Sequence, residues 1–358
     1  MRNPYKDLPN RSFWRKSVTE KGVFGYSELW ISKWRVPRNG KFSTYGSCFA
    51  QHISRALVAR ELDWLDCEQP PGNASTDLAK KFNYGVYSSR TANIYTARQL
   101  LTWCEFALDV TKCSTIEVWE KDGRYFDSLR PAIEPNGFAS VEECRASLMS
   151  TAYAFRRSIV SADVFVFTLG LTEGWENKKT GQPYAVCPGT IAGRFSEDDH
   201  VFRNYDYVEV LNDIRAALDA LRILSPNIRI LLTVSPVPLV ATASREHVLV
   251  ATQYSKSVLR AVAGSISMAN EDVDYFPSYE LIAGAPTRGM FFEPDMRSVA
   301  QQGVDLVMGH FFEGLRWSNA KDKTIDHRST PDADRIYSEQ RKQDLICEEI
   351  ALDKQDET

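Results

Sequence analysis

The run Gly46-Ser47-Cys48 places a hydroxyl and a thiol directly after a glycine, and both groups can act as nucleophiles in acyl transfer. Residues 41–45 alternate polar and aromatic side chains, as a short strand does, and residues 49–57 carry apolar side chains at helical spacing. A glycine between a strand and a helix places the next side chains at the carboxyl edge of a sheet, beside the free N–H groups of a helix N-terminus. Cys48 or Ser47 is then placed to attack a carbonyl carbon while those N–H groups hold the oxyanion. Two structural roles fit the same pattern, because a serine before a helix is often an N-cap and a cysteine is often a small buried apolar residue.

Three further apolar runs also end in small or polar residues. In an open parallel sheet, ligands bind beyond the carboxyl ends of the strands, so these ends should converge with the first one. The three are Gly170-Leu171-Thr172-Glu173, Ser235-Pro236-Val237-Pro238 and Pro277-Ser278-Tyr279-Glu280.

The elements that must position these residues alternate between strand and helix. Residues 163–169 and 228–234 are almost continuously apolar, which is typical of parallel strands buried on both faces. Shorter strands are predicted at 61–66 and 273–276, and a β-hairpin insertion at 115–130 turns at Asp122-Gly123. A second insertion follows residue 173, with turns at 179–181 and 187–190. Helices are predicted from their apolar periodicity and caps at 97–103, 140–161, 205–224, 247–266 and around 304–311.

This order predicts an α/β fold with three αβα layers, a mostly parallel central sheet and β-hairpin insertions. We expect residues 1–40 to form an arm that packs its tryptophans onto the domain, and residues 41–318 to form the domain itself. Residues 319–358 are highly charged and indicate a peripheral tail, with one helix around 334–351.

Composition excludes several classes of function. The net charge of about −4 over 358 residues gives no bulk attraction to nucleic acid or to an anionic membrane. Residues 1–7 lack the apolar core of a signal peptide and no apolar run is long enough to span a bilayer, so we expect a cytoplasmic protein. The seven cysteines form no C-x-x-C pair, and neither a metal cluster nor a glycine-rich phosphate loop is present in the sequence.

The run Gly46-Ser47-Cys48-Phe49-Ala50 resembles the motif that names the GSCFA family, a bacterial group placed in the SGNH/GDSL hydrolase superfamily. Further segments resemble the same family, in one order over roughly residues 40–315. They are Thr91–Thr96, Phe167–Glu173, Thr233–Leu239, Tyr254–Ser257 and Tyr275–Glu280. The resemblance implies the flavodoxin-like αβα fold of the SGNH hydrolases and an acyl-transfer activity.

The superfamily's motifs imply roles for residues of this chain. The Gly-Asp-Ser motif, laid on Gly46-Ser47-Cys48, puts Cys48 at the nucleophile position and Ser47 where Asp belongs. The Gly-x-Asn-Asp motif resembles Gly170-Leu171-Thr172-Glu173, so Thr172 takes the place of the oxyanion-binding Asn. Asn93 is a second candidate donor, by its position in a loop.

The last superfamily motif, Asp-x-x-His, departs from its pattern here. The chain has Asp295-Met296-Arg297-Ser298, with a serine in place of the catalytic histidine. Among the five histidines, His247 opens a helix at the correct sheet edge and is our candidate for the base. Arg297 could instead bind a carboxylate or phosphate as a bidentate donor.

Two functions are therefore expected from the sequence. The first is an esterase or O-acyltransferase that acts on an O-acylated small molecule or glycan through Cys48 or Ser47, with no required cofactor and with acyl-CoA as an acyl donor. The alternative is a module that binds a glycan or acyl carrier and has lost turnover, which the missing histidine favours. The sequence leaves the oligomeric state open.

Overall fold

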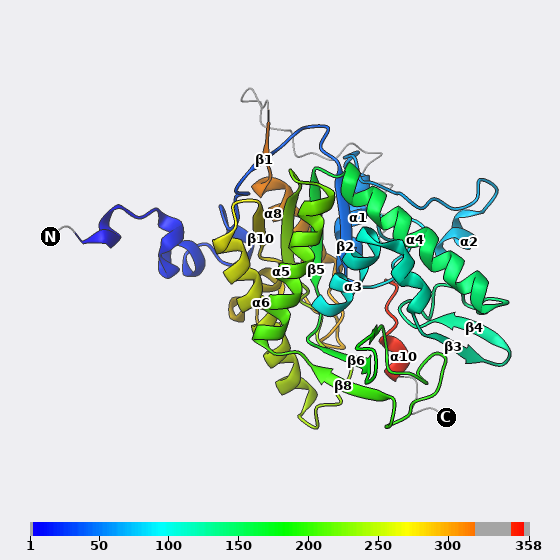
Figure 1. Ribbon diagram of the computed structural model, residues 1–358. Helices are drawn as coiled ribbons and strands as arrows, with labels where there is room; N and C mark the ends of the chain where they lie inside the picture. Colours follow the sequence, from blue (N-terminus) through cyan, green and yellow to red (C-terminus); the bar gives the residue numbers. More distant parts are fainter. Residues whose placement is uncertain (1–2, 319–344, 354–358) are drawn as a thin grey trace.

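A four-stranded parallel sheet forms the centre of the molecule in a computed structural model that describes residues 3–318 and 345–353 (Figure 1). The strand order is β10-β9-β5-β2. Every residue of β5 is buried, as expected for a strand that is covered on both faces. The strands are β2 (Phe42–Gly46), β5 (Val164–Leu169), β9 (Arg229–Val234) and β10 (Val273–Phe276).

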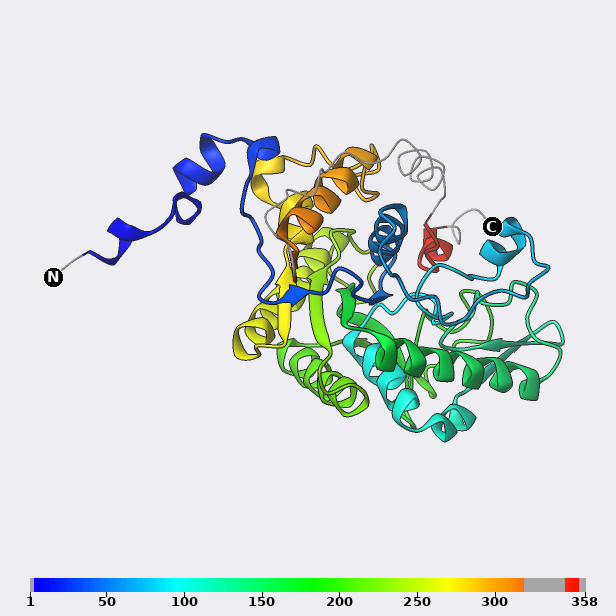
Figure 2. The same cartoon turned by 90° about the horizontal axis from the view of Figure 1, so that it is seen from above.

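Helices cover both faces of this sheet, so the fold has the three αβα layers that the sequence predicts (Figure 2). Alternate side chains of β5 point to opposite faces, with Phe165 and Phe167 on one and Val164 and Val166 on the other. The first face is covered by α3 (Ala97–Leu108), α4 (Val141–Ser161), α5 (Tyr207–Leu224) and α6 (Val248–Ala269). The second is covered by α1 (Ala50–Ala59), α7 (Ser278–Ala283) and α8 (Gln301–Gly314).

Two β insertions extend the scaffold. The hairpin β3 (Val118–Lys121) and β4 (Arg124–Asp127) turns at Asp122-Gly123, where both residues have positive φ as a type I′ turn requires. The second insertion is an antiparallel sheet in the order β7-β6-β8, formed by β6 (Glu173–Asn177), β7 (Pro183–Tyr184) and β8 (His200–Asn204). A short helix, α2 (Thr76–Lys81), precedes the hairpin. The strand predicted at 61–66 is reduced to one bridge between Trp64 and Phe42.

The N-terminal residues form short turns before they reach the domain, and the first of them extend away from it (Figure 1). Trp30 and Trp34 are buried, and Trp30 Nε1 donates a hydrogen bond to Asp274 Oδ2 over 3.2 Å. Trp14 is 66% exposed, so the expected packing of all three tryptophans is wrong for this one. The two-residue strands β1 (Arg35–Val36) and β11 (Arg316–Trp317) pair in parallel and join this region to the end of the domain.

Residues 345–353, called the C-terminal segment below, lie over the carboxyl edge of the sheet and end in the short helix α10 (Ile350–Asp353). Most of the tail predicted from residue 319, including most of the helix predicted at 334–351, lies outside the described residues. The described part is packed rather than peripheral, because Leu345 and Cys347 contact the apolar cluster under α1 and Glu348 is buried against polar partners. In the described chain, no helix is both long enough and apolar enough to cross a membrane.

Candidate functional site

A strained glycine turn carries Ser47 and Cys48 out of the sheet. Gly46, the last residue of β2, has φ +136°, and a Cβ atom there would lie 2.4 Å from the carbonyl oxygen of Thr168 on β5. Only glycine fits this position. The N–H group of Ser47 donates a hydrogen bond to the same carbonyl over 3.1 Å, and this contact fixes the direction in which the chain leaves the strand.

Ser47 points into the protein and does not cap the following helix. No side chain makes a cap hydrogen bond at the start of α1, so the N-cap role of Ser47 is not realised. Its buried Oγ atom has no hydrogen-bond partner among the described residues. A Cβ atom on Gly170 would lie 2.9 Å from Ser47 Cβ, so Gly170 is the glycine that makes room for this side chain.

Cys48 is a buried thiol whose neighbour is a second thiol, that of Cys347 in the C-terminal segment. The hydrogen bond to Cys347, together with burial, raises the pKa of Cys48 well above its usual value. The positive charge of Arg297 opposes this rise. In the present arrangement, Cys48 is therefore the protonated member of the pair.

Cys347 is the member of that pair whose pKa is lowered. The hydrogen bond from Cys48, assisted by Tyr95 and Arg297, lowers the pKa of Cys347 below its usual value. The hydroxyl oxygen of Tyr95 lies 3.7 Å from Cys347 Sγ, and its one proton is shared with the carboxylate of Glu348 at 2.8 Å. The site thus stabilises one thiolate and one thiol side by side.

Side-chain amides hold the backbone of the C-terminal segment. Gln51 donates from Nε2 to the carbonyl oxygen of Ile346 over 2.7 Å, and its Oε1 accepts from Ile346 N over 3.2 Å. Asn93 Nδ2 donates to the same carbonyl over 2.9 Å and also to the carboxylate of Glu348. Tyr95 donates to that carboxylate over 2.8 Å. Asn93, which we predicted from its loop position, therefore does lie at this site and presents its donor group there.

Two cationic side chains, one half-buried and one buried, complete the surroundings of Cys48. Arg297 Nη2 lies 3.8 Å from a carboxylate oxygen of Glu349. Lys256, on α6, is almost fully buried and donates from Nζ to the carbonyl oxygen of Gly170 over 2.6 Å. Burial lowers the pKa of Lys256 to about 8, and burial raises that of Glu349 to about 8. Lys256 thus keeps most of its positive charge at neutral pH, near both Glu349 and Cys48.

His247 and Asp295, predicted from the sequence as the base and its partner, form hydrogen bonds with their own local backbone. His247 is exposed at the start of α6, where its Nδ1 accepts a hydrogen bond from Leu249 N over 3.2 Å. The exposed Asp295 accepts from the N–H groups of Arg297 and Ser298 and from the hydroxyl of Ser298, so it forms a local turn. The charged groups that act on Cys48 come instead from Arg297 and the C-terminal segment.

Thr172, which we predicted to bind the oxyanion, uses its hydroxyl and N–H groups to bind other parts of the protein. Its hydroxyl donates to Asn204 Oδ1 over 2.7 Å, and its N–H donates to Ser255 Oγ over 3.0 Å. The loop 170–172 is thereby fixed from two sides, by β8 and by α6. Ser255 and Lys256 are neighbours on α6 and hold successive parts of this loop, which is a positioning role.

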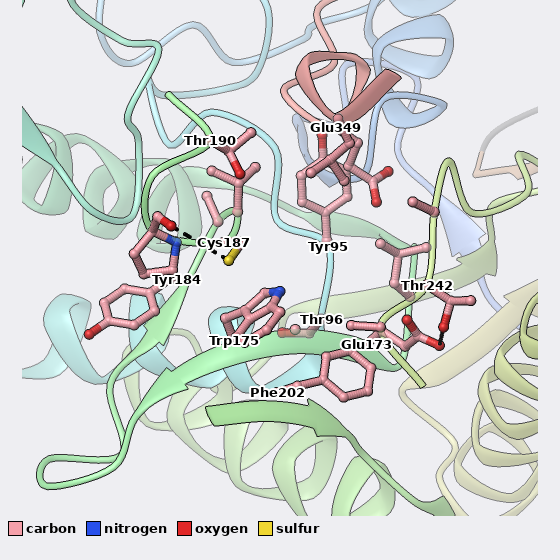
Figure 3. Close-up of a pocket in the computed structure, with 18 of the residues that line it drawn as sticks. Tyr95, Thr96, Glu173, Trp175, Tyr184, Cys187, Thr190, Phe202, Thr242 and Glu349 are labelled. Atoms are coloured by element: carbon pink, nitrogen blue, oxygen red, sulfur yellow. Dashed lines mark hydrogen bonds between the residues drawn. The ribbon is translucent and has the colours of Figure 1, made fainter. Parts of the chain in front are cut away.

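A cavity of about 520 Å³ opens beside the site, between β6, β7 and the C-terminal segment (Figure 3). Trp175, Tyr184 and Phe202 give it aromatic walls, and Glu173 accepts a hydrogen bond from Thr242 Oγ1 over 2.7 Å at one side. Cys48 does not line this cavity. Tyr95 and Glu349 line the cavity and are also neighbours of the thiol pair, so they lie between the two.

Comparison with known proteins places the chain in a family. The model of the GSCFA family matches residues 41–311. The chain belongs to the GSCFA family. No curated protein matches the sequence.

Among solved structures, this GSCFA chain is similar to a carbohydrate esterase of family 3 from Talaromyces cellulolyticus, with a TM-score of 0.35 and 10% identity. That match covers 76% of this chain and 94% of the esterase. It is also similar to the family 3 carbohydrate esterase of Clostridium thermocellum, with a TM-score of 0.32 and 10% identity over 76% of this chain and 94% of that one.

Several residues of the site were not predicted from the sequence. Lys256 lies in Tyr254–Ser257, one of the segments that carry the GSCFA resemblance, and this was the one signal that pointed to it. Cys347 and Glu349 lie in a charged stretch beyond the matched residues, where no local pattern marks them. In the described part of the chain, no group of three or more potential ligands is placed to hold a metal ion.

Proposed function

We propose that this GSCFA protein is an acyl-transfer enzyme, an esterase or acyltransferase, in which Cys48 is the nucleophile. The observation that carries the proposal is the position of Cys48. Its thiol follows the turn between β2 and α1 at the carboxyl edge of the parallel sheet, beside the cation Arg297. Ligands bind at this edge in open α/β sheets, and a nearby positive charge favours the thiolate that attacks a carbonyl carbon.

Donors for an oxyanion are available at the same place. Among the described residues, the backbone N–H groups of Cys48 and Phe49 have no backbone partner, as is usual in the first turn of a helix. Asn93 Nδ2 and the hydroxyl of Tyr95 both donate to one carboxylate oxygen of Glu348. An anionic oxygen of a tetrahedral intermediate can accept from Asn93 Nδ2 and from these backbone N–H groups once that carboxylate is displaced.

The neighbouring cavity suits the larger part of a substrate. Its aromatic walls, formed by Trp175, Tyr184 and Phe202, fit the apolar face of a sugar ring or an acyl chain. Glu173, whose pKa is raised by burial, supplies a polar group that can orient a hydroxyl. We therefore propose a small molecule or glycan as the substrate: its O-acyl ester where the enzyme hydrolyses, and its free hydroxyl as the acyl acceptor where the enzyme transfers.

Steady-state hydrolysis of 4-nitrophenyl acetate tests this function. Cys48→Ala should lower the rate by about a thousandfold or more, as removal of a nucleophile does, while the fold measured by circular dichroism is unchanged. Ser47→Ala is the matched control one residue away, and it should keep most of the activity. Loss of activity in Ser47→Ala with full activity in Cys48→Ala would assign the nucleophile to Ser47.

A second function, a binding module without turnover, is favoured by one observation. The site is filled by the chain's own C-terminal segment, and Gln51, Asn93 and Arg297 all bind it. Thiol titration separates the two functions. A reactive Cys48 is alkylated near neutral pH once Cys347 is replaced, whereas in an inert module Cys48 resists alkylation up to high pH.

A further inference from the structure

A second sulfur atom is held against the proposed nucleophile, and its surroundings suit a negative charge. Cys347 Sγ lies against the Cys48 thiol and Arg297. The Tyr95 hydroxyl, which donates its proton to Glu348 over 2.8 Å, is 3.7 Å from the same sulfur and can turn to it when the C-terminal segment withdraws. Among the described residues, Nε and Nη2 of Arg297 are buried and have no hydrogen-bond partner. Arg297 therefore has donors to spare for an anion at this position.

The site also binds the amide group that precedes this sulfur in the chain, between Ile346 and Cys347. From the carbonyl of Ile346, the covalent path runs through the nitrogen, Cα and Cβ of Cys347 to its sulfur. This is the skeleton of an N-acylcysteamine. Gln51 and Asn93 hold the carbonyl oxygen over 2.7 and 2.9 Å, while Tyr95 contacts the sulfur.

We propose that the groove over Cys48 binds an acyl thioester of an N-acylcysteamine-type thiol, such as the arm of an acyl-coenzyme A, with the thioester sulfur where Cys347 Sγ lies. This inference rests on the proposed function and names the acyl donor for it. The C-terminal segment is then the resident competitor of the donor, and it withdraws when the donor binds.

The transfer step balances without a histidine. The proton of the Cys48 thiol passes to water, and the thiolate attacks the thioester carbonyl. A bond forms between Cys48 Sγ and the acyl carbon, the bond between that carbon and the donor sulfur breaks, and the donor leaves as a thiolate. One negative charge moves from one sulfur to the other, past the same cation, Arg297.

The donor class also explains the departure from Asp-x-x-His. An alkoxide leaving group needs a general acid, because an alcohol is a far weaker acid than a thiol such as that of cysteine, whose pKa is about 8.5. A thiolate can leave without protonation, and it leaves faster when its pKa is lowered. Tyr95 and Arg297 supply that stabilisation, so this step does not need the histidine that Ser298 replaces.

The test compares two acetyl donors that differ by one atom. S-acetyl-N-acetylcysteamine and the O-acetyl ester of N-acetylethanolamine are each mixed with the full chain, and acetyl-Cys48 is followed by intact mass spectrometry. Glutathione treated with the same pair gives the preference of a free thiol. We expect the protein to prefer the thioester by about tenfold more than glutathione does, the worth of one hydrogen bond to a charged group.

Variants make the result specific to this groove. Tyr95→Phe should bring the preference several-fold closer to that of glutathione, whereas Tyr153→Phe, at an exposed tyrosine of α4, should leave it unchanged. Glu349→Gln removes a carboxyl group 3.8 Å from Arg297 Nη2, and burial raises the pKa of that carboxyl to about 8. Both donors should therefore react faster in this variant above about pH 8, where the wild-type carboxyl is charged and holds the C-terminal segment against Arg297. A preference equal to that of glutathione, with Cys48 acetylated by both donors, overturns the thioester inference and leaves the proposed function standing. If neither donor acetylates Cys48, in wild type or in Glu349→Gln, the proposed function fails as well.

Discussion

Lys256 donates a hydrogen bond from its buried ammonium group to the carbonyl oxygen of Gly170 over 2.6 Å. This contact ties α6 to the loop after β5, next to Ser47. An ammonium group enclosed in this way remains costly in its charged form, because burial removes water that one accepted hydrogen bond does not replace.

The stability of the protein should therefore depend on pH through Lys256. Its pKa is lowered from an ordinary 10.5 to about 8, so in that interval the unfolded chain binds a proton that the folded chain has released. Lys256 should consequently contribute a rise in the free energy of unfolding as the pH rises from about 8 to about 10.5, against the opposite contribution of buried thiols with a raised pKa, such as Cys187. In urea unfolding experiments, the wild-type free energy minus that of Lys256→Met should therefore rise across the interval, whereas the difference between wild type and Lys81→Met, at an exposed lysine, should stay constant. A constant difference for Lys256→Met would contradict the burial of the charge.

His247 should prove unimportant for activity. It is exposed and caps α6 through Leu249, so His247→Gln should change the hydrolysis of a model ester by less than about threefold and lower stability by about 1 kcal/mol or less. Activity and thermal unfolding of the variant measure the two effects separately. A loss of about a hundredfold, the usual worth of a general base, would restore the histidine to the mechanism.

Gly46 should tolerate no side chain. Gly46→Ala would place a Cβ atom 2.4 Å from a backbone oxygen and hold alanine at φ +136°, so we expect a loss of about 3 kcal/mol or more in the free energy of unfolding. Chemical denaturation gives the value. Gly72→Ala is the matched control, because a Cβ atom there meets nothing within 4 Å. Equal stability of the two variants would mean that the turn after β2 is not built as described.

Replacement of Cys347 should make Cys48 more reactive. The hydrogen bond between the two thiols is the main cause of the raised pKa of Cys48, so Cys347→Ser should lower that pKa and speed alkylation by iodoacetamide near neutral pH. Peptide mapping of the alkylated protein measures the rate at Cys48 itself. Cys67→Ser, which removes a thiol that is not among the groups acting on Cys48, should leave that rate unchanged. A slower reaction in Cys347→Ser would contradict the proposed sharing of one proton by the pair.

The fold could be predicted from local sequence because its signals are local. Continuous apolar runs identified β5 and β9, a cap residue marked the start of both α3 and α4, an apolar face identified α5, and Asp122-Gly123 marked the hairpin turn. Gly46 marked the turn that carries Cys48, and this turn has the strand-to-helix geometry that was predicted.

The other half of the site could not be predicted, since its contacts span the whole chain. Ile346 is bound by Gln51, nearly 300 positions earlier, and the acidic composition around Glu349 indicates solvent exposure rather than burial. Lys256 likewise looks like an ordinary polar position on a helix until its partner Gly170 is known. The partners of a buried charge are set by tertiary packing, which no local spacing records.

The identity of the nucleophile is tested most directly by locating the acyl group. The full chain is mixed with 4-nitrophenyl acetate, quenched with acid within the first turnover and digested, and the acetylated peptide is sequenced by mass spectrometry. We predict that acetate is found on Cys48, and that Cys48→Ala shows no acetylated residue in the peptide that contains positions 46–50. Acetate on Ser47, or an unmodified peptide from a protein that still turns over the ester, would contradict the assignment of Cys48.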